Sequence, residues 1–320
     1  MRRFLAIAGI VLLLAGCRAR TRPVVGVVPK GANHIFWQTV HAGAVKAGQE
    51  FKLDIEWNAP TLEIDSSRQI AIVESMINRR LAGIALAPVD RKALVNVVDR
   101  AHATGIPVAI FDSDIDTNNR ITYVATDNRE GGRMAARRLG ELMLGSGKCA
   151  IIGFMPGSAS TMEREEGFQQ ELKSAYPKIR MVQLAFGMAR QAQARAATEN
   201  ILSAHPDLTG LFADNESSSA GAVMALRGRR TTQVRTVAFD SNTQLIDDLR
   251  DRFLDALIVQ DPMKMGYESV KAIARKLRGE NPPAHIDSGV YLVDRSNLER
   301  PDILPLLYPD IKRYLEPRDR

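Results

Sequence analysis

Short apolar runs alternate along the chain with longer segments in which apolar residues recur every three or four positions. Apolar runs with the length of a strand occupy 24–28, 53–57, 83–87 and 108–111. Helical spacing is found between them at 36–50, 65–80 and 91–104. Strands that alternate with helices in this way are typical of a parallel sheet whose two faces are both covered.

The same alternation starts again in the second half of the chain. Strands are predicted at 149–154, 181–184, 210–213 and 236–239. Helices are predicted at 128–145, 161–175, 191–204 and 217–227. Two such runs predict an α/β protein made of two doubly wound parallel-sheet lobes.

One three-residue motif is repeated at the end of a predicted strand in each half. Residues 111–113 and 239–241 both read Phe-Asp-Ser. Open parallel sheets bind ligands beyond the carboxyl ends of their strands. Two lobes that face each other there would form a cleft, with Asp112 and Asp240 on opposite sides of it.

The first residues have the pattern of an export signal. Arg2 and Arg3 precede an uncharged, mostly apolar run at 4–16, which is shorter than the roughly 20 residues that span a bilayer. The run ends in Leu-Ala-Gly before Cys17, which resembles the lipidation motif of bacterial lipoproteins. We therefore expect a signal peptide at 1–16 and a lipidated tether at 17–23, with the lipid on Cys17 as the membrane contact. An ordinary signal peptide with a chance cysteine is the alternative.

Charge and cysteine content narrow the choice of partners. The 320 residues include 43 basic and 37 acidic side chains, and the two signs are interleaved. A nucleic-acid-binding surface would instead concentrate its basic residues with aromatic ones, so no nucleic-acid partner is expected. With Cys17 lipidated, Cys149 has no disulfide partner, and its apolar neighbours predict a buried structural thiol.

The sequence offers no recognisable catalytic or cofactor motif. The turn at 29–33, after the first strand, has neither the dinucleotide nor the phosphate-loop glycine pattern. No Gly-x-Ser-x-Gly elbow is present, and the five histidines lack metal-ligand spacing. We expect no catalytic residue, no cofactor and no metal, and hence a protein that is not an enzyme.

Several short motifs, in their order and spacing, resemble the type I periplasmic sugar-binding proteins of ABC importers, above all the ribose-binding group. They lie at 36–37, 106–107, 111–112, 125–128, 131–132, 164–168, 204–207, 212–215, 237–240 and 260–261. The resemblance implies a type I periplasmic binding protein fold, a monomer in which a three-crossing hinge joins the lobes. The implied N-terminal lobe is 24–126 plus 261–287, and the C-terminal lobe is 127–260 plus 288–315.

The resemblance also implies a set of ligand-binding residues. Sugars need aromatic faces for their C–H surfaces and charged or amide groups for their hydroxyls. The matching positions are Phe36, Trp37, Asp112, Arg164, Asn215, Asp240 and Gln260. Packing on the sheet, helix capping, surface ion pairs and hinge structure are the alternative roles for these side chains.

Some positions depart from the ribose-binding pattern. Ser113 stands where that group has an arginine, and Ala87 where it has an asparagine. Lys30, together with the acids around Ser113, is similar to autoinducer- and rhamnose-binding relatives. Lys30, His34 and Ser113 are therefore further ligand candidates, with a surface lysine and a helix-start histidine as alternatives.

The resulting hypothesis is an exported, lipid-anchored protein that delivers a monosaccharide or similar polyol to an ABC permease by hinge bending. A sugar or autoinducer receptor for signalling is one alternative. An exported glycoside-processing enzyme with Asp112 and Asp240 as its acids is another. A DNA-binding regulator is excluded, because the signal peptide occupies the place of a helix-turn-helix segment.

Overall fold

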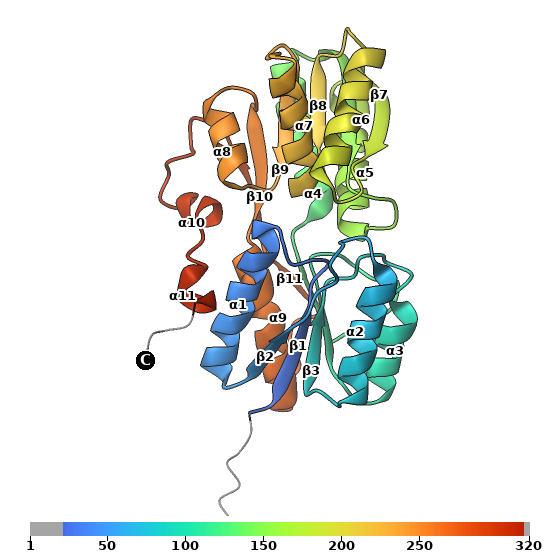
Figure 1. Ribbon diagram of the computed structural model, residues 1–320, viewed down its shortest axis with the longest axis vertical. Coiled ribbons are helices and arrows are strands. Elements are labelled where there is room, and N and C mark those ends of the chain that lie inside the picture. The colour runs from blue at the N-terminus through green and yellow to red at the C-terminus, as the bar shows by residue number, and fades with distance from the viewer. Residues whose placement is uncertain (1–21, 317–320) are drawn as a thin grey trace, which may run out of the picture.

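The computed structural model describes residues 22–316, which form two α/β lobes placed end to end (Figure 1). The expected signal peptide and Cys17 lie outside the described residues. Within 22–316, no helix is long and apolar enough to cross a membrane.

The first lobe is built on a six-stranded parallel sheet with the order β11-β5-β4-β3-β1-β2. Its strands are β1 (Val24–Val28), β2 (Asp54–Trp57), β3 (Gly83–Leu86), β4 (Val108–Phe111), β5 (Thr122–Ala125) and β11 (His285–Asp287). Helices α1 (Ile35–Phe51) and α9 (Pro262–Leu277) pack on one face. Helices α2 (Ser66–Asn78) and α3 (Val95–Ala103) pack on the other, so that two apolar clusters enclose the sheet.

The second lobe repeats this plan with the strand order β12-β10-β9-β8-β6-β7. Its strands are β6 (Ser146–Gly153), β7 (Lys178–Phe186), β8 (Gly210–Ala213), β9 (Arg235–Phe239), β10 (Ala256–Gln260) and β12 (Val290–Val293). Strand β12 is antiparallel to β10. Helices α4 (Asn128–Leu142) and α5 (Ala159–Ala175) cover one face, and α6 (Gln191–Ala204), α7 (Glu216–Gly228) and α8 (Thr243–Arg250) cover the other.

The predicted fold class, two doubly wound lobes, is confirmed. The eight predicted strands and seven predicted helices are all present, some with the predicted bounds and the others with shifted ends. The helix expected at 91–104 begins at Val95, because residues 91–94 form turns. The strand expected at 181–184 extends over the whole of β7. Strands β5, β10, β11 and β12 are additional, and β11 is too short to show a period of its own.

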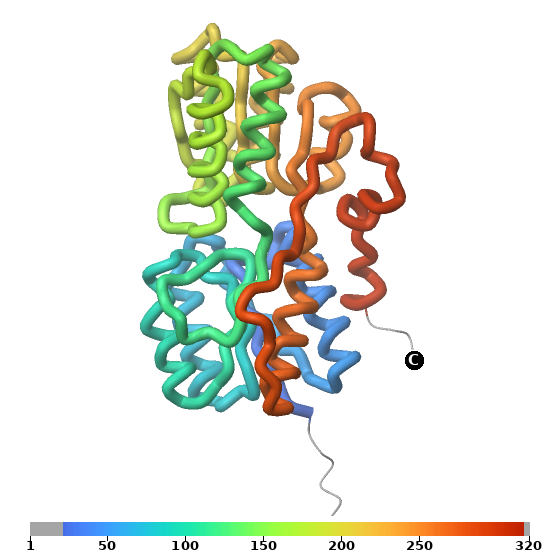
Figure 2. Tube along the Cα trace, turned by 180° about the vertical axis from the view of Figure 1, so that it is seen from behind, coloured from blue at the N-terminus to red at the C-terminus, as the bar shows by residue number. Residues whose placement is uncertain are grey.

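The chain passes between the lobes at three adjacent places, between β5 and α4, between β10 and α9, and between β11 and β12 (Figure 2). Two of these crossings are tied together. The hydroxyls of Thr126 and Ser288 lie 3.1 Å apart, and Thr126 Oγ1 also donates to the carbonyl of Gly289 at 3.1 Å. These crossings form the hinge region.

The C-terminal segment runs back along the side of the molecule. Short helix α10 (Leu304–Leu307) places Leu307 in the apolar core of the second lobe. The next helix, α11 (Lys312–Leu315), lies against α1 of the first lobe (Figure 1). The segment beyond β12 therefore touches both lobes, whereas the sequence analysis placed residues 288–315 in the second lobe alone.

Candidate ligand-binding cleft

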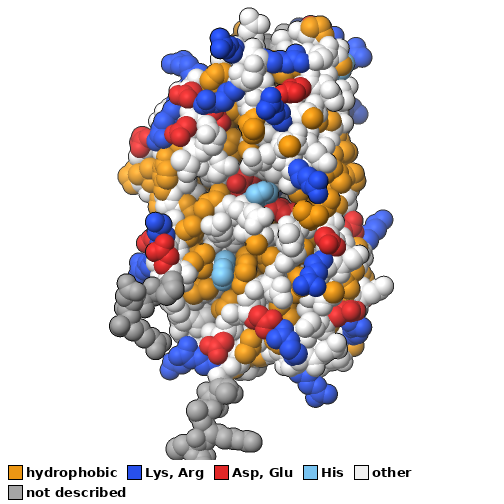
Figure 3. Space-filling view, in the orientation of Figure 1, with side chains coloured by type: hydrophobic (Ala, Val, Ile, Leu, Met, Phe, Trp, Pro, Cys, Tyr) orange, Lys and Arg blue, Asp and Glu red, His pale blue; other side chains and the backbone are white. Residues whose placement is uncertain are grey.

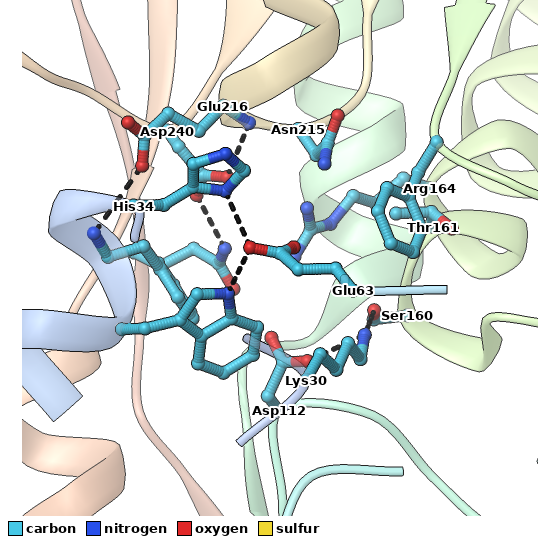
Figure 4. A pocket seen from close by; sticks show the side chains of 14 residues that line it. Lys30, His34, Glu63, Asp112, Ser160, Thr161, Arg164, Asn215, Glu216 and Asp240 are labelled. Carbon is cyan, nitrogen blue, oxygen red and sulfur yellow. Dashed lines mark hydrogen bonds and ion pairs between the residues drawn. The ribbon is translucent and has the colours of Figure 1, made fainter. Parts of the chain in front are cut away.

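The carboxyl ends of the strands in both sheets point toward the space between the lobes, where a small cavity lies. Acidic and histidine side chains gather where the lobes meet (Figure 3). The first lobe contributes Lys30, His34, Phe36, Trp37, Glu63 and Asp112 to the lining. The second contributes Phe154, Ser160, Thr161, Arg164, Asn215, Glu216 and Asp240, and Gln260 lines it from the hinge (Figure 4).

Two aromatic side chains in the first turn of α1 form the apolar wall of the cleft. The rings of Phe36 and Trp37 are nearly perpendicular, with centroids 4.8 Å apart. Trp37 also packs edge-on against Phe111 at the end of β4. Its indole Nε1 donates to Glu63 Oε1 at 2.9 Å, which fixes the orientation of the ring.

Glu63 holds a second cleft residue by the same oxygen. His34 Nδ1 lies 2.8 Å from Glu63 Oε1. Burial lowers the pKa of His34, but the hydrogen bond to Glu63 and the charges of Glu63, Glu216 and Asp240 outweigh it and raise the pKa to about 9. The imidazole is therefore positively charged at neutral pH.

Lys30 connects the two lobes at the floor of the cleft. Its ammonium group lies 2.8 Å from Asp112 Oδ2 in its own lobe. Across the cleft it donates to the hydroxyls of Ser158 at 3.2 Å and Ser160 at 3.1 Å. An ammonium group has three donors. Two of these donors reach the other lobe and the charge faces Asp112, so Lys30 serves closure in this conformation.

Asp240 is held at the opposite end of the cleft. Its Oδ1 accepts from Gln260 Nε2 at 2.7 Å, and its Oδ2 accepts from the backbone N–H of Glu216 at 3.0 Å. Burial raises the pKa of Asp240, while the charge of Arg164 and the hydrogen bond from Gln260 oppose the shift. The contact with Gln260 joins a ligand candidate directly to the hinge.

Arg164 is fully buried on α5 and is held by close helix packing. A Cβ at Gly132 of α4 would overlap the carbonyl of Arg164, so this approach of α4 to α5 requires glycine. Arg164 Nε donates to Asn128 Oδ1 at 2.9 Å, Nη1 donates to the carbonyl of Asp214 at 2.8 Å, and the guanidinium stacks on Phe239. Nη2 has no hydrogen-bond partner in the described part of the chain, which leaves its two N–H groups for ligand hydroxyls.

The start of α7 brings two more polar side chains to the cleft. Asn215 caps the helix by accepting from the N–H of Ser218 at 3.1 Å. Glu216 reaches across to the first lobe, where its Oε2 accepts from the N–H of Phe36 at 3.4 Å. Its other oxygen accepts from Asn242 Nδ2 at 3.2 Å. Burial raises the pKa of Glu216, and the positive charge of His34 opposes the shift.

Nine of the ten residues expected at the site line the cleft, and their role as ligands stays a prediction. Ser113 does not line it. Its hydroxyl accepts from the N–H of Ser160 at 3.1 Å, which is a further contact between the lobes. The sequence reasoning missed Glu63, Phe154, Ser160, Thr161 and Glu216. Phe154 directly follows β6, and Glu216 lies just beyond β8. Because parallel sheets bind ligands beyond the carboxyl ends of their strands, both residues could have been predicted from the sequence.

The described residues, 22–316, contain no group of three or more metal-ligating side chains that could hold an ion. Cys149 is buried in β6, and burial raises the pKa of its thiol to about 12.

The comparisons with known proteins agree with this architecture. A family model described as a periplasmic binding protein domain matches residues 25–281. The D-ribose/D-allose-binding protein of Pseudomonas aeruginosa is 30% identical over 290 residues, which cover 87% of this chain and 90% of that protein. The ribose import binding protein of Bacillus subtilis is 30% identical over 216 residues, 68% of this chain and 70% of that protein.

Solved structures lead to the same group. An ABC transporter solute-binding protein from Agrobacterium vitis with bound D-fucose has a TM-score of 0.87 and 31% identity, covering 89% of this chain and all of that one. A carbohydrate transporter solute-binding protein from Agrobacterium radiobacter in complex with D-arabinose has a TM-score of 0.88 and 28% identity, covering 90% of this chain and 99% of that one. The chain belongs to the periplasmic binding protein family, as a type I sugar-binding member.

Proposed function

We propose that the protein is exported, anchored by a lipid on Cys17, and captures one monosaccharide or similar small polyol per chain for an ABC importer. Binding between the lobes closes them about the hinge, and the closed form delivers the sugar to the permease. The proposal includes neither a catalytic step nor a cofactor.

One observation carries this proposal: an aromatic wall and buried hydrogen-bonding groups face the same cavity from opposite lobes. Phe36 and Trp37 offer surface to the C–H faces of a sugar ring. Arg164 Nη2 and Gln260 Oε1 are buried without a hydrogen-bond partner among residues 22–316, and Asp240 lies beside them. A sugar hydroxyl can both donate and accept, so one polyol would satisfy the free donor and the free acceptor.

The related proteins support the choice of ligand class. By their names, those compared above bind D-ribose or D-allose, D-arabinose and D-fucose. The departures at Ser113 and Ala87 argue that the sugar differs from D-ribose. Pentoses, hexoses and deoxyhexoses are therefore the first compounds to test.

A thermal-shift screen followed by calorimetry tests the proposal. A ligand that binds the folded form raises the melting temperature by mass action. We expect one sugar or polyol to bind with a dissociation constant of about 1 μM or below, which is about 8 kcal/mol of binding free energy. Chromatography of the recovered sugar should find it unchanged. Binding of amino acids or peptides alone, or conversion of the sugar, would contradict the proposal.

A further inference from the structure

The cleft is lined by more acidic side chains than cationic ones. Four carboxylates line it, from Glu63, Asp112, Glu216 and Asp240. Three cationic groups, Lys30, His34 and Arg164, face them. The lining therefore has one carboxylate more than it has cations, and the question is which acid is left without a cation of its own.

Two of the acids form an ion pair: Asp112 pairs with Lys30, and Glu63 pairs with His34, each at 2.8 Å. The charge of Arg164 acts on Asp240, and the charge of His34 acts on Glu216 as well. Glu216 therefore shares its cation with Glu63, and its hydrogen bonds come from neutral donors, the amide of Asn242 and the backbone N–H of Phe36. Glu216 is also only 5% exposed, so water screens its charge poorly.

The start of α1 enters the cleft and is already occupied by a carboxylate. Helix N-termini attract anions through their free N–H groups and the helix dipole. The first turn of α1 contains no acid, and His34 at its N-cap makes no side-chain capping bond. Glu216 from the other lobe takes this place, by accepting from the N–H of Phe36.

The start of α7 is occupied in the same way. Asp240 accepts from the N–H of Glu216, and Asn215 accepts from the N–H of Ser218. The cleft thus offers an anionic ligand two helix ends that already hold carboxylates. The charge of Arg164 already acts on two carboxyl groups of the protein, because burial raises the pKa of Asp214 and of Asp240 and the positive charge of Arg164 opposes both shifts.

We propose that the cleft selects uncharged sugars and rejects sugar acids and sugar phosphates, and that Glu216 is the residue that determines this selection. The inference rests on the proposed sugar-binding function and specifies its ligand class. Closing the lobes around an anion would bury it beside a carboxylate that forms no ion pair and shares its only cation with Glu63, and this repulsion excludes the ligand. A neutral sugar can donate a hydroxyl proton to the same carboxylate and gains from it.

Calorimetry on matched neutral and anionic compounds tests this selection. D-Fucose is compared with D-galacturonate, and D-ribose and D-arabinose are compared with their 5-phosphates, at pH 7 and 0.15 M salt. Where the neutral compound of a pair binds, the affinity of wild type for it should exceed the affinity for the anionic compound by about a hundredfold or more. Glu216→Gln should narrow this ratio of affinities about tenfold or more, because it removes the negative charge of this side chain and keeps its shape. Glu166→Gln, which changes an exposed carboxylate on the outer side of α5, should leave the ratio unchanged.

The outcomes separate this inference from the function on which it rests. If wild type binds a neutral sugar and its anionic counterpart equally, the selection is wrong while the sugar-binding function stands; this result needs no variant to fold. If Glu216→Gln melts like wild type and keeps the wild-type ratio, Glu216 is not the determinant. If neither the neutral nor the anionic compounds bind, nor any other sugar or polyol of the screen, the proposed function itself fails.

Discussion

Asp112 and Asp240 occupy equivalent positions in the two lobes and have the same unusual backbone. Each follows a buried phenylalanine at the end of a strand, and each has a left-handed φ, 61° for Asp112 and 67° for Asp240. Each also donates its backbone N–H to the next strand, to Val124 at 3.0 Å and to Ile258 at 2.8 Å. The repeated motif thus builds the same turn twice, and the two turns aim a carboxylate into the cleft from both sides.

The two carboxylates have different partners, which predicts different effects of substitution. Asp240→Asn should weaken sugar binding about tenfold to a hundredfold, because charged hydrogen bonds contribute about 1.5–3 kcal/mol. Asparagine tolerates a left-handed φ, so the turn should survive. Calorimetry measures the affinity, and Asp302→Asn, an exposed acid paired with Arg300, is the control. Wild-type affinity in Asp240→Asn would remove Asp240 from the set of ligands.

Lys30 should act on closure, because its ammonium group pairs with Asp112 in its own lobe and donates to two hydroxyls of the other lobe. Lys30→Met leaves Asp112 buried without its cation, a change that costs about 3–5 kcal/mol in other buried pairs. The affinity for every sugar that binds should fall by a similar factor, since the closed form is destabilised whatever ligand it holds. X-ray scattering at saturating sugar should show a radius that decreases less than that of wild type.

A double variant provides the control for Lys30. Lys30→Met combined with Asp112→Asn removes both charges, so it should recover part of the closure that Lys30→Met loses. A loss that is large for one sugar and absent for another would contradict the closure role. That result would instead make Lys30 a direct ligand.

Local patterns were sufficient to predict the residues at the ends of strands. The carboxylates of Asp112 and Asp240 follow apolar strands, and in parallel sheets that position faces the ligand site. The positions of these two acids could be predicted from the order of elements within one lobe, with nothing known about the other. The aromatic pair at the start of α1 was predicted differently, from the resemblance to the sugar-binding family.

Contacts between lobes could not be predicted in this way. Lys30 and its partner Ser160 are 130 residues apart, and Glu216 and Phe36 are 180 apart. These residues come into contact only when the lobes close at a particular angle. The local spacing of apolar residues in the sequence carries no information about that angle. Glu63 was missed for a different reason: it lies in the irregular loop between β2 and α2, where periodicity gives no signal.

The proposed anchor predicts a change of location. Cys17→Ser should prevent lipidation and move the exported protein from the membrane fraction to the soluble fraction. One saturated chain gives weak binding, so a stable anchor requires the additional acyl groups of a lipoprotein. Fractionation followed by mass spectrometry of the mature N-terminus measures both points. Wild type that is already free of membranes after export would contradict the anchor.

The charge of His34 predicts that stability falls at alkaline pH. The pKa of His34 is about 9 in the folded protein and close to 6.5 when unfolded. Because the folded pKa lies above the unfolded one, protonated His34 contributes to the free energy of unfolding. This contribution is fully present below pH 6.5 and is lost as the pH rises through 9. The difference corresponds to about 3 kcal/mol at most. Urea unfolding of wild type and His34→Asn at pH 6, 7.5 and 9.5 isolates the contribution from other titrating groups.

The difference in the free energy of unfolding between wild type and His34→Asn should be largest at pH 6 and nearly absent at pH 9.5. Glu63→Gln should reduce it as well, because the carboxylate of Glu63 supplies the hydrogen bond and the nearest charge that raise the pKa of His34. His102→Asn, a substitution of an exposed histidine near the end of α3, should leave the pH dependence of unfolding as in wild type. A constant difference between wild type and His34→Asn across this range would mean that folding leaves the pKa of His34 unchanged. The imidazole would then be mostly neutral above pH 6.5, and Glu63 would lose its cationic partner there.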